Sequence, residues 1–145
     1  MANIEDILSA GEEEEIVEAI RQAEKTTSGE IRIHIERTAP EEAIERAAEV
    51  FHFLKMDNTR ERNGVLIYVA VESRVFVIFG DKGINEVVPP GFWDTTRDIM
   101  LKHFKEGDYK QGIIEGVLKS GEQLQKYFPW KHGDDNELPD EISKG

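Results

Sequence analysis

Cysteine is absent from this 145-residue chain, and long apolar runs are absent as well. Without thiols the chain can form no disulfide framework, no thiolate metal site and no cysteine nucleophile. No stretch approaches the ~18 consecutive apolar residues of a membrane-spanning helix. The first ~25 residues are acidic and lack the apolar core of a signal peptide. We therefore expect a soluble, cytoplasmic chain, and a membrane-tethered parent protein stays open as an alternative.

Basic residues are scarce too. The chain has 18 lysines and arginines against 30 acidic residues, which gives a net charge of -12. The negative electrostatic field of such a chain repels nucleic acid and anionic lipid. It also disfavours binding of a phosphate ester unless a cation neutralises the phosphate charge. The length suits one domain with a real core. We expect a monomer that binds divalent cations or another protein, with no nucleic-acid partner.

The common catalytic and nucleotide-binding motifs are missing from the sequence. No Gly-x-x-x-x-Gly-Lys-Ser/Thr is present, and no Gly-x-Gly-x-x-Gly follows a strand. Gly-x-Ser-x-Gly is absent, and the four histidines lack the paired spacing of a zinc site. Two acidic segments fail as EF-hand loops. Counted from Asp57 or Asp134, the twelfth position is Tyr68 or Gly145, where the loop needs a bidentate glutamate.

The most informative stretch is a pair of apolar runs, residues 65–71 and 75–79. Nearly unbroken apolar runs of this length are typical of strands that are covered on both faces. Only residues 72–74 separate the two runs, too few for a crossover helix, so we expect an antiparallel hairpin. The hairpin places Asn63, before its first strand, beside the GDKG segment that follows its second.

Residues 30–37 form a different kind of strand, because apolar and polar residues alternate along them. Three isoleucines occupy one face, while Arg32, His34 and Glu36 occupy the other. We expect a half-buried strand that lies near a sheet edge or has one face only partly covered. We interpret His34 as a solvated or ion-paired residue rather than as a ligand.

Two capping boxes indicate where the first two helices begin. Ser9 with Glu12, and Thr38 with Glu41, have the spacing at which a hydroxyl and a carboxylate cap a helix start reciprocally. Apolar residues at helical spacing follow each box and predict helices that run to about residues 25 and 56.

Two later helices are predicted, one from residue 92 to near Gly107 and one over residues 109–127. In the second, small residues recur every four positions at Gly112, Gly116 and Ser120. This repeat predicts a close contact with another helix or with the sheet.

The elements combine into an α/β fold. A strand, a helix and a hairpin in succession form a βαβ crossover followed by an antiparallel pair. The expected architecture is a small mixed sheet with helices on both faces. We expect residues 1–128 to form this single domain and residues 129–145 to form a flexible acidic tail.

Oxygen-bearing side chains gather at one end of the predicted sheet. The starts of two parallel strands and the end of the antiparallel third lie together there. The candidate ligands are Glu30, Asp57, Asn58, Asn63, Asp81 and Glu86. Carboxylate and amide oxygens suit a hard cation such as Ca²⁺ or Mg²⁺. Asn-Gly and GDKG are also common turn sequences, so a pair of ordinary turns stays open as the alternative.

Four features together resemble the TPM domain family, which includes a thylakoid lumen phosphatase-like protein, a photosystem II repair factor and a receptor modulator. They are the strand NGVLIYVA, the basic residue in the hairpin ESRVFVIFG, the loop GDKG and the stretch FKEGDYKQGIIEG. Ser28-Gly29 matches the family's Thr-Gly, and the similarity covers roughly residues 4–127. The resemblance implies a three-layer α/β/α sandwich, binding of a divalent cation, expected to be Ca²⁺, and a suggested acid-phosphatase activity.

The sequence departs from the family after the glycine loop. Many members have an aspartate there, whereas residues 87–90 of this chain read VVPP, so Glu86 or Asp94 would have to replace it. We therefore expect a cation-binding accessory domain and assign no catalytic residue. A metal-dependent, acid-phosphatase-like hydrolase and a metal-free protein-interaction module stay open as alternatives.

Overall fold

The computed structural model describes residues 8–130 and 142–145. Its elements are α1 (Ala10–Glu24), β1 (Glu30–Glu36), α2 (Ala43–Phe53), β2 (Gly64–Ala70), β3 (Val75–Gly80), α3 (Lys82–Asn85), α4 (Asp94–Lys105), α5 (Tyr109–Gln125) and β4 (Ser143–Lys144). The strands form one sheet in the order β3-β2-β1-β4. Within these ranges, no helix has the length and apolar character needed to cross a membrane.

The pairing of the strands confirms both the predicted crossover and the predicted hairpin. β1 and β2 run parallel, with Glu30 opposite Gly64. β2 and β3 run antiparallel, with Val65 opposite Gly80. The starts of β1 and β2 and the end of β3 therefore lie at the same end of the sheet.

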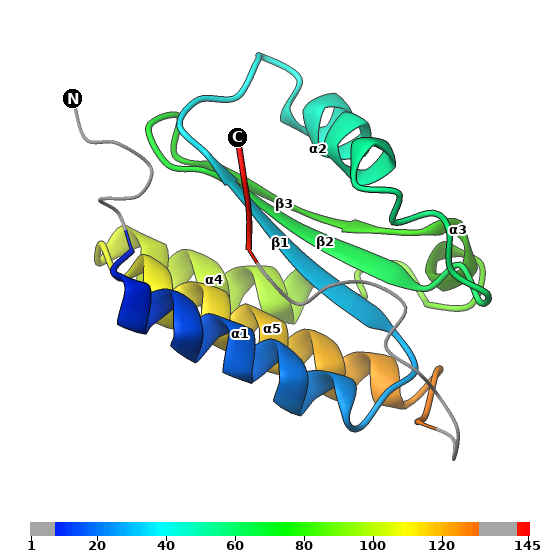
Figure 1. The fold of residues 1–145 in the computed structure, drawn as a ribbon. Coiled ribbons are helices and arrows are strands. Elements are labelled where there is room, and N and C mark those ends of the chain that lie inside the picture. The colour runs from blue at the N-terminus through cyan, green and yellow to red at the C-terminus, as the bar shows by residue number, and fades with distance from the viewer. Residues whose placement is uncertain (1–7, 131–141) are drawn as a thin grey trace.

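Helices cover both faces of the sheet, as Figure 1 shows: α2 lies on one face, and α1, α4 and α5 lie on the other. Neighbouring side chains of a strand point to opposite faces, so β2 divides its residues between two cores. Val65, Ile67 and Val69 pack in the core with α1, α4 and α5, while Leu66 and Tyr68 pack with α2. The predicted three-layer α/β/α sandwich is confirmed.

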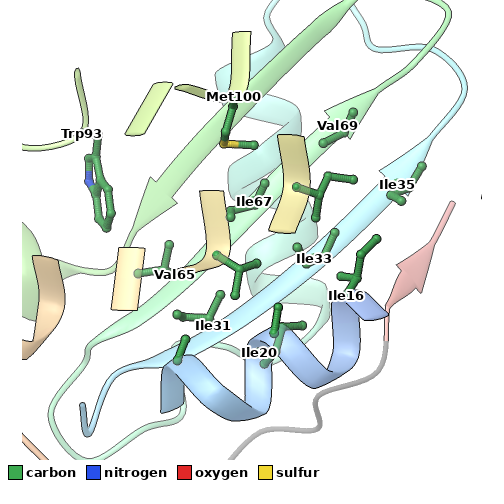
Figure 2. Packing of buried hydrophobic residues seen from close by; sticks show 14 of the residues in the cluster. Ile16, Ile20, Ile31, Ile33, Ile35, Val65, Ile67, Val69, Trp93 and Met100 are labelled. Atoms are coloured by element: carbon green, nitrogen blue, oxygen red, sulfur yellow. The ribbon is translucent and has the colours of Figure 1, made fainter. Parts of the chain in front are cut away.

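The larger core lies between the sheet and the three-helix layer. In Figure 2, Ile16 and Ile20 of α1 lie beside the isoleucines of β1, and Met100 of α4 lies over the β2–β3 hairpin. Ile16, Ile20 and Met100 are fully buried. Burying an apolar side chain of this size contributes about 1.5–3 kcal/mol. The amphipathic pattern of the helices thus fixes which face each of them presents to the sheet.

One of the two predicted capping boxes is present. The Glu12 amide donates to Ser9 Oγ at 3.1 Å, and the Ser9 amide donates to Glu12 Oε1 at 3.0 Å. The second prediction is wrong, because α2 begins at Ala43, after a residue that makes no side-chain cap. The segment before α2 is held by the hairpin turn instead: the Ala39 amide donates to Ser73 Oγ at 2.9 Å.

The prediction of a half-buried β1 is also wrong, because all seven of its residues are buried. Two features cover its polar side chains. Glu36 is bound by Tyr68 of β2 and by Arg46 of α2. His34 is bound by Ser143 of β4, which pairs in parallel with β1 at the sheet edge. The expected nearness to an edge holds, since β4 borders β1 over only two residues.

β4 lies within the segment that the sequence predicts as a flexible tail. Lys144 Nζ approaches Glu13 Oε1 of α1 at 2.6 Å, and the Gly145 amide donates to the Ile35 carbonyl at 2.9 Å. These contacts join the last residues to α1 and β1. Residues 131–141 of the predicted tail lie outside the described part of the chain.

The small residues of α5 provide the predicted close contact. A Cβ atom added to Gly112 would lie 2.5 Å from the Phe104 ring, and one added to Gly116 would lie 2.5 Å from Met100 Sδ. On the side that faces α1, a Cβ at Gly121 would lie 2.7 Å from Ala23 Cβ and 3.1 Å from its Cα. The glycines therefore let α5 lie close to both α4 and α1.

We expect Gly121→Ala to lower the free energy of unfolding by about 1–3 kcal/mol, because the added methyl group meets the backbone of α1. The matched control is Gly11→Ala in the first turn of α1, where a Cβ meets only Ser9 Oγ at 3.9 Å. This control should gain up to about 1 kcal/mol from helix propensity. Urea unfolding of the two variants measures both changes, and equal effects would contradict the packing argument.

Candidate functional site

Three segments meet at the end of the sheet where β1 and β2 begin and β3 ends. The Glu30 amide donates to the Asn63 carbonyl at 3.3 Å, and the Asp81 amide donates to the Gly64 carbonyl at 2.9 Å. The Gly83 amide donates to the Arg62 carbonyl at 2.8 Å. We call residues 28–30, 61–63 and 81–83 the polar edge. Backbone hydrogen bonds alone join its three segments, independently of their side chains.

Gly83 explains why the GDKG loop contains glycine. A Cβ atom at this position would lie 2.2 Å from the Glu61 carbonyl oxygen and 2.6 Å from that of Arg62. No side chain fits there without separating the two loops. The glycine is thus required by the close approach of the loops, and it fixes the segment after β3 against the segment before β2.

Asn63 is the centre of one hydrogen-bonded group on the polar edge. Its side chain is buried, and Nδ2 donates to Ser28 Oγ at 3.2 Å and to Glu61 Oε2 at 3.3 Å. The Ser28 hydroxyl in turn donates to Glu61 Oε2 at 2.6 Å. The Ser28 hydroxyl and the Glu61 carboxylate are therefore held together by the Asn63 amide nitrogen at the start of β2.

Asp81 is the centre of a second group. Its Oδ1 accepts from the Lys82 amide at 2.7 Å and caps α3, and its Oδ2 accepts from Arg62 Nε at 3.1 Å. The Asp81 side chain is 6% exposed, whereas that of Arg62 is 48% exposed. Arg62 thus neutralises a buried carboxylate from the solvent side.

The structure brings together only some of the predicted ligands. Glu30, Asn63 and Asp81 belong to the polar edge. Asp81 and Glu86 line a hollow of about 370 Å³, which His52 of α2 also lines. Asp57 is hydrogen-bonded to the same histidine. Its Oδ2 lies 2.9 Å from His52 Nδ1, and this hydrogen bond lowers the pKa of Asp57.

Two further candidates point elsewhere. Asn58 is exposed in the loop before β2. Asp94, the suggested replacement for the family's aspartate, pairs with Arg97 on α4 at 3.8 Å. Among the described residues, no three acidic or histidine side chains are grouped so that they could hold a metal ion. The sequence analysis did not name Ser28, Glu61 or Arg62 as site residues. For Glu61 and Arg62, the available signal was their position directly before Asn63 in the chain.

The donor chemistry of the polar edge permits a cation, although not an enclosed cage. Glu61 and Asp81 offer carboxylates and Ser28 offers a hydroxyl oxygen, all of which are hard ligands, whereas Asn63 turns its amide nitrogen toward Ser28 and Glu61. Asp81 already has a counterion in Arg62, so a metal would have to displace the guanidinium. Such separate oxygen donors would suit only a hydrated divalent ion that takes most of its coordination from water.

A separate polar cluster lies beneath α2 and has a structural role. Glu36 accepts from Arg46 Nε at 2.9 Å and Nη2 at 2.7 Å, and from the Tyr68 hydroxyl. His34 Nε2 lies 3.1 Å from Glu36 Oε1, and its ring stacks on Tyr68. Burial alone would raise the pKa of Glu36, but these hydrogen bonds outweigh it and lower the pKa from 4.5 to about 2.

The fold resembles known structures over most of its length. The chain is a three-layer α/β/α domain, and the TPM domain model matches its residues 2–123. The chain belongs to the TPM domain family. The NMR structure of the BA42 protein from the psychrophilic bacterium Bizionia argentinensis has a TM-score of 0.93 and 59% identity, with 100% of both chains covered.

A more distant structure shares the fold alone. The solution NMR structure of the N-terminal domain of a protein from P. gingivalis has a TM-score of 0.68 and 24% identity. The match covers 84% of this chain and 79% of that one. No curated protein matches the chain with significance.

We expect Glu36→Gln to destabilise the fold by about 2–3 kcal/mol, because it leaves the partly buried Arg46 and the buried Tyr68 and His34 with a weaker, uncharged acceptor. Glu49→Gln is the matched control. It also contacts Arg46, at 3.3 Å, but it is 69% exposed and should cost at most about 0.5 kcal/mol. Thermal unfolding followed by circular dichroism compares the two.

Acid should destabilise the wild type more than Glu36→Gln. A lowered pKa in the folded state means that the unfolded chain binds more protons, so stability rises with pH. The Glu36 contribution is complete above pH 4.5 and is lost as the pH falls towards 2. Burial lowers the pKa of His34, which adds a loss as the pH falls below 6.5. A variant with the wild-type pH profile would contradict this assignment.

Proposed function

We propose that this TPM domain is an accessory, divalent-cation-binding module whose polar edge takes up Ca²⁺ or Mg²⁺ in exchange for the Arg62 guanidinium. The observation that carries the proposal is the Asp81 carboxylate, buried and held at 3.1 Å by a half-exposed arginine. The proposal assigns binding and no reaction.

Asp81 is a buried carboxylate whose charge must be compensated. A buried carboxylate needs a compensating positive charge or several hydrogen bonds, because it has lost its hydration. Arg62 supplies that charge, and its exposed position allows the guanidinium to rotate into water. A divalent cation that reaches Asp81 can therefore replace it without leaving the carboxylate uncompensated.

The chain segment that carries Arg62 also carries a second acidic residue. Arg62 lies between Glu61 and Asn63 in the chain, and the Asn63 amide is bonded to the Glu61 carboxylate. A cation that displaces Arg62 would therefore bind beside the segment that carries a second carboxylate and the Ser28 hydroxyl bonded to it. The net charge of -12 also raises the local concentration of cations.

The ligand set also limits the affinity of the polar edge for Ca²⁺. Ca²⁺ takes six to eight oxygen ligands, and the charge of the ligand set tunes its dissociation constant. Two carboxylates and a competing arginine support a dissociation constant of roughly 10⁻⁴–10⁻³ M, the range of weak calcium modules. Water would complete the coordination.

We expect Asp81→Asn to weaken Ca²⁺ binding at least about tenfold, since it removes the anchoring charge while asparagine still caps α3. Arg62→Gln should tighten binding severalfold, because it removes the competing guanidinium. Asp98→Asn, an exposed residue of α4, loses the same charge as Asp81→Asn and should leave affinity unchanged. Isothermal titration calorimetry of the full chain measures all three variants.

Two outcomes would contradict the proposal. Equal weakening in Asp81→Asn and Asp98→Asn would mean that Ca²⁺ only screens the acidic surface. Weaker binding in Arg62→Gln would mean that the arginine supports the ion site and does not compete with it. Amide chemical shifts of ¹⁵N-labelled protein localise the response and should move first at residues 61–63 and 81–83.

A further inference from the structure

A pocket of about 460 Å³ lies at the opposite end of the sheet from the polar edge. It is formed by the β2–β3 turn and the connection between α4 and α5, which lie at the same side of the molecule in Figure 1. Apolar side chains dominate its wall, among them Val69 of β2, Phe76 of β3 and Leu101 of α4. Ligand pockets commonly have this size and character, about 300–1,000 Å³ with mostly apolar walls.

Aromatic packing gives the pocket a fixed wall. Phe76 and Phe104 meet edge to face with ring centroids 5.1 Å apart, and Tyr109 lies 5.4 Å from Phe104. Gly112 leaves no room behind Phe104, since a Cβ there would lie 2.5 Å from its ring. The Phe104 ring is thus held between β3 and α5, which makes the pocket preformed.

The charge of the pocket is opposite to that of the chain. Arg74 and Lys105 both line it, and none of its lining residues is acidic. In the described part of the chain, neither cation has an ion-pair partner. Both side chains are exposed and lie beside an apolar wall, so their positive charges are available to an anionic ligand in the pocket.

The backbone of Arg74 supports a role for its side chain. Arg74 is the last turn residue before β3, and its φ of 55° lies in the left-handed region. A non-glycine residue pays roughly 1–2 kcal/mol for this conformation, and glycine or asparagine would adopt it more easily. An outlier of this kind is a reason to look for a function of the side chain.

We propose that this pocket binds a small carboxylic acid with an apolar chain or ring. Arg74 and Lys105 hold the carboxylate at the mouth, and the apolar body lies against Phe76 and Phe104. A guanidinium matches a carboxylate with two parallel hydrogen bonds, and a single negative charge suits an acidic protein better than a phosphate dianion. The proposal is independent of cation binding at the polar edge.

The pocket joins residues that are far apart in the sequence. Thirty residues separate Arg74 from Phe104 in the chain, and the fold brings both to one pocket. Neither residue belongs to the polar edge.

Decanoate is the probe for the first test, with decanol as the uncharged control of the same chain length. In ¹⁵N-labelled full-length protein, decanoate below its micelle concentration should saturate and should shift the amides of Ala70, Phe76 and Phe104. Decanol should bind at least about threefold more weakly. Equal binding of the two probes, or shifts that never saturate, would overturn the proposal.

Variants separate recognition from structure. Arg74→Gln and Lys105→Gln should each lower decanoate affinity about three- to tenfold. Lys102→Gln is the matched control: it removes the same charge from an exposed residue of α4 outside the pocket and should leave the affinity unchanged. Arg74→Gly relieves the left-handed backbone, so it should keep or raise the melting temperature and still lose affinity. A lower melting temperature with unchanged affinity would show that Arg74 serves only the turn.

Discussion

The burial of β2 on both faces is the constraint on which the rest of the structure depends. All seven residues of this strand are buried, and they alternate between the core under α2 and the core under the three-helix layer. A shift of one residue in its pairing would exchange those two sets of side chains, so the register is strongly specified. β1 and β3 take their positions from it, and with them the loops at both ends of the sheet.

This register makes the two ends of the sheet chemically different. At one end, the segments that precede β1 and β2 and follow β3 are joined by backbone hydrogen bonds, and their polar side chains form two hydrogen-bonded groups, one around Asn63 and one around Asp81. At the other end, the hairpin turn meets the α4–α5 connection over an apolar pocket with a cationic mouth. The sheet between them is scaffold, and the chemistry available to ligands lies at its ends.

Local patterns were sufficient to predict most of the fold. Continuous apolar runs identified the hairpin, a strict alternation identified β1, and small residues in α5 identified its close contacts. The errors concern long-range partners. The polar face of β1 is buried because Arg46, Tyr68 and Ser143 reach it from 10, 32 and 109 residues away. No local pattern contains that information.

Local patterns also predicted which end of the sheet gathers Glu30, Asn63 and Asp81. Turn sequences located Asn63 and Asp81, and the strand order brought them to one end of the sheet. The sequence did not show that Asp57 would be hydrogen-bonded to His52 on α2, or that Arg62 would form an ion pair with Asp81. Side-chain pairing of this kind decides which oxygens can reach an ion, and it depends on loop conformations that only the folded chain defines.

The central claim is that the cation and Arg62 compete for Asp81. The most direct measurement is a structure of the full chain determined with saturating Ca²⁺. The account predicts that Arg62 Nε leaves Asp81 Oδ2, from which it is now 3.1 Å distant, and that the ion contacts this carboxylate. An intact Arg62–Asp81 pair in the Ca²⁺-saturated protein would contradict it.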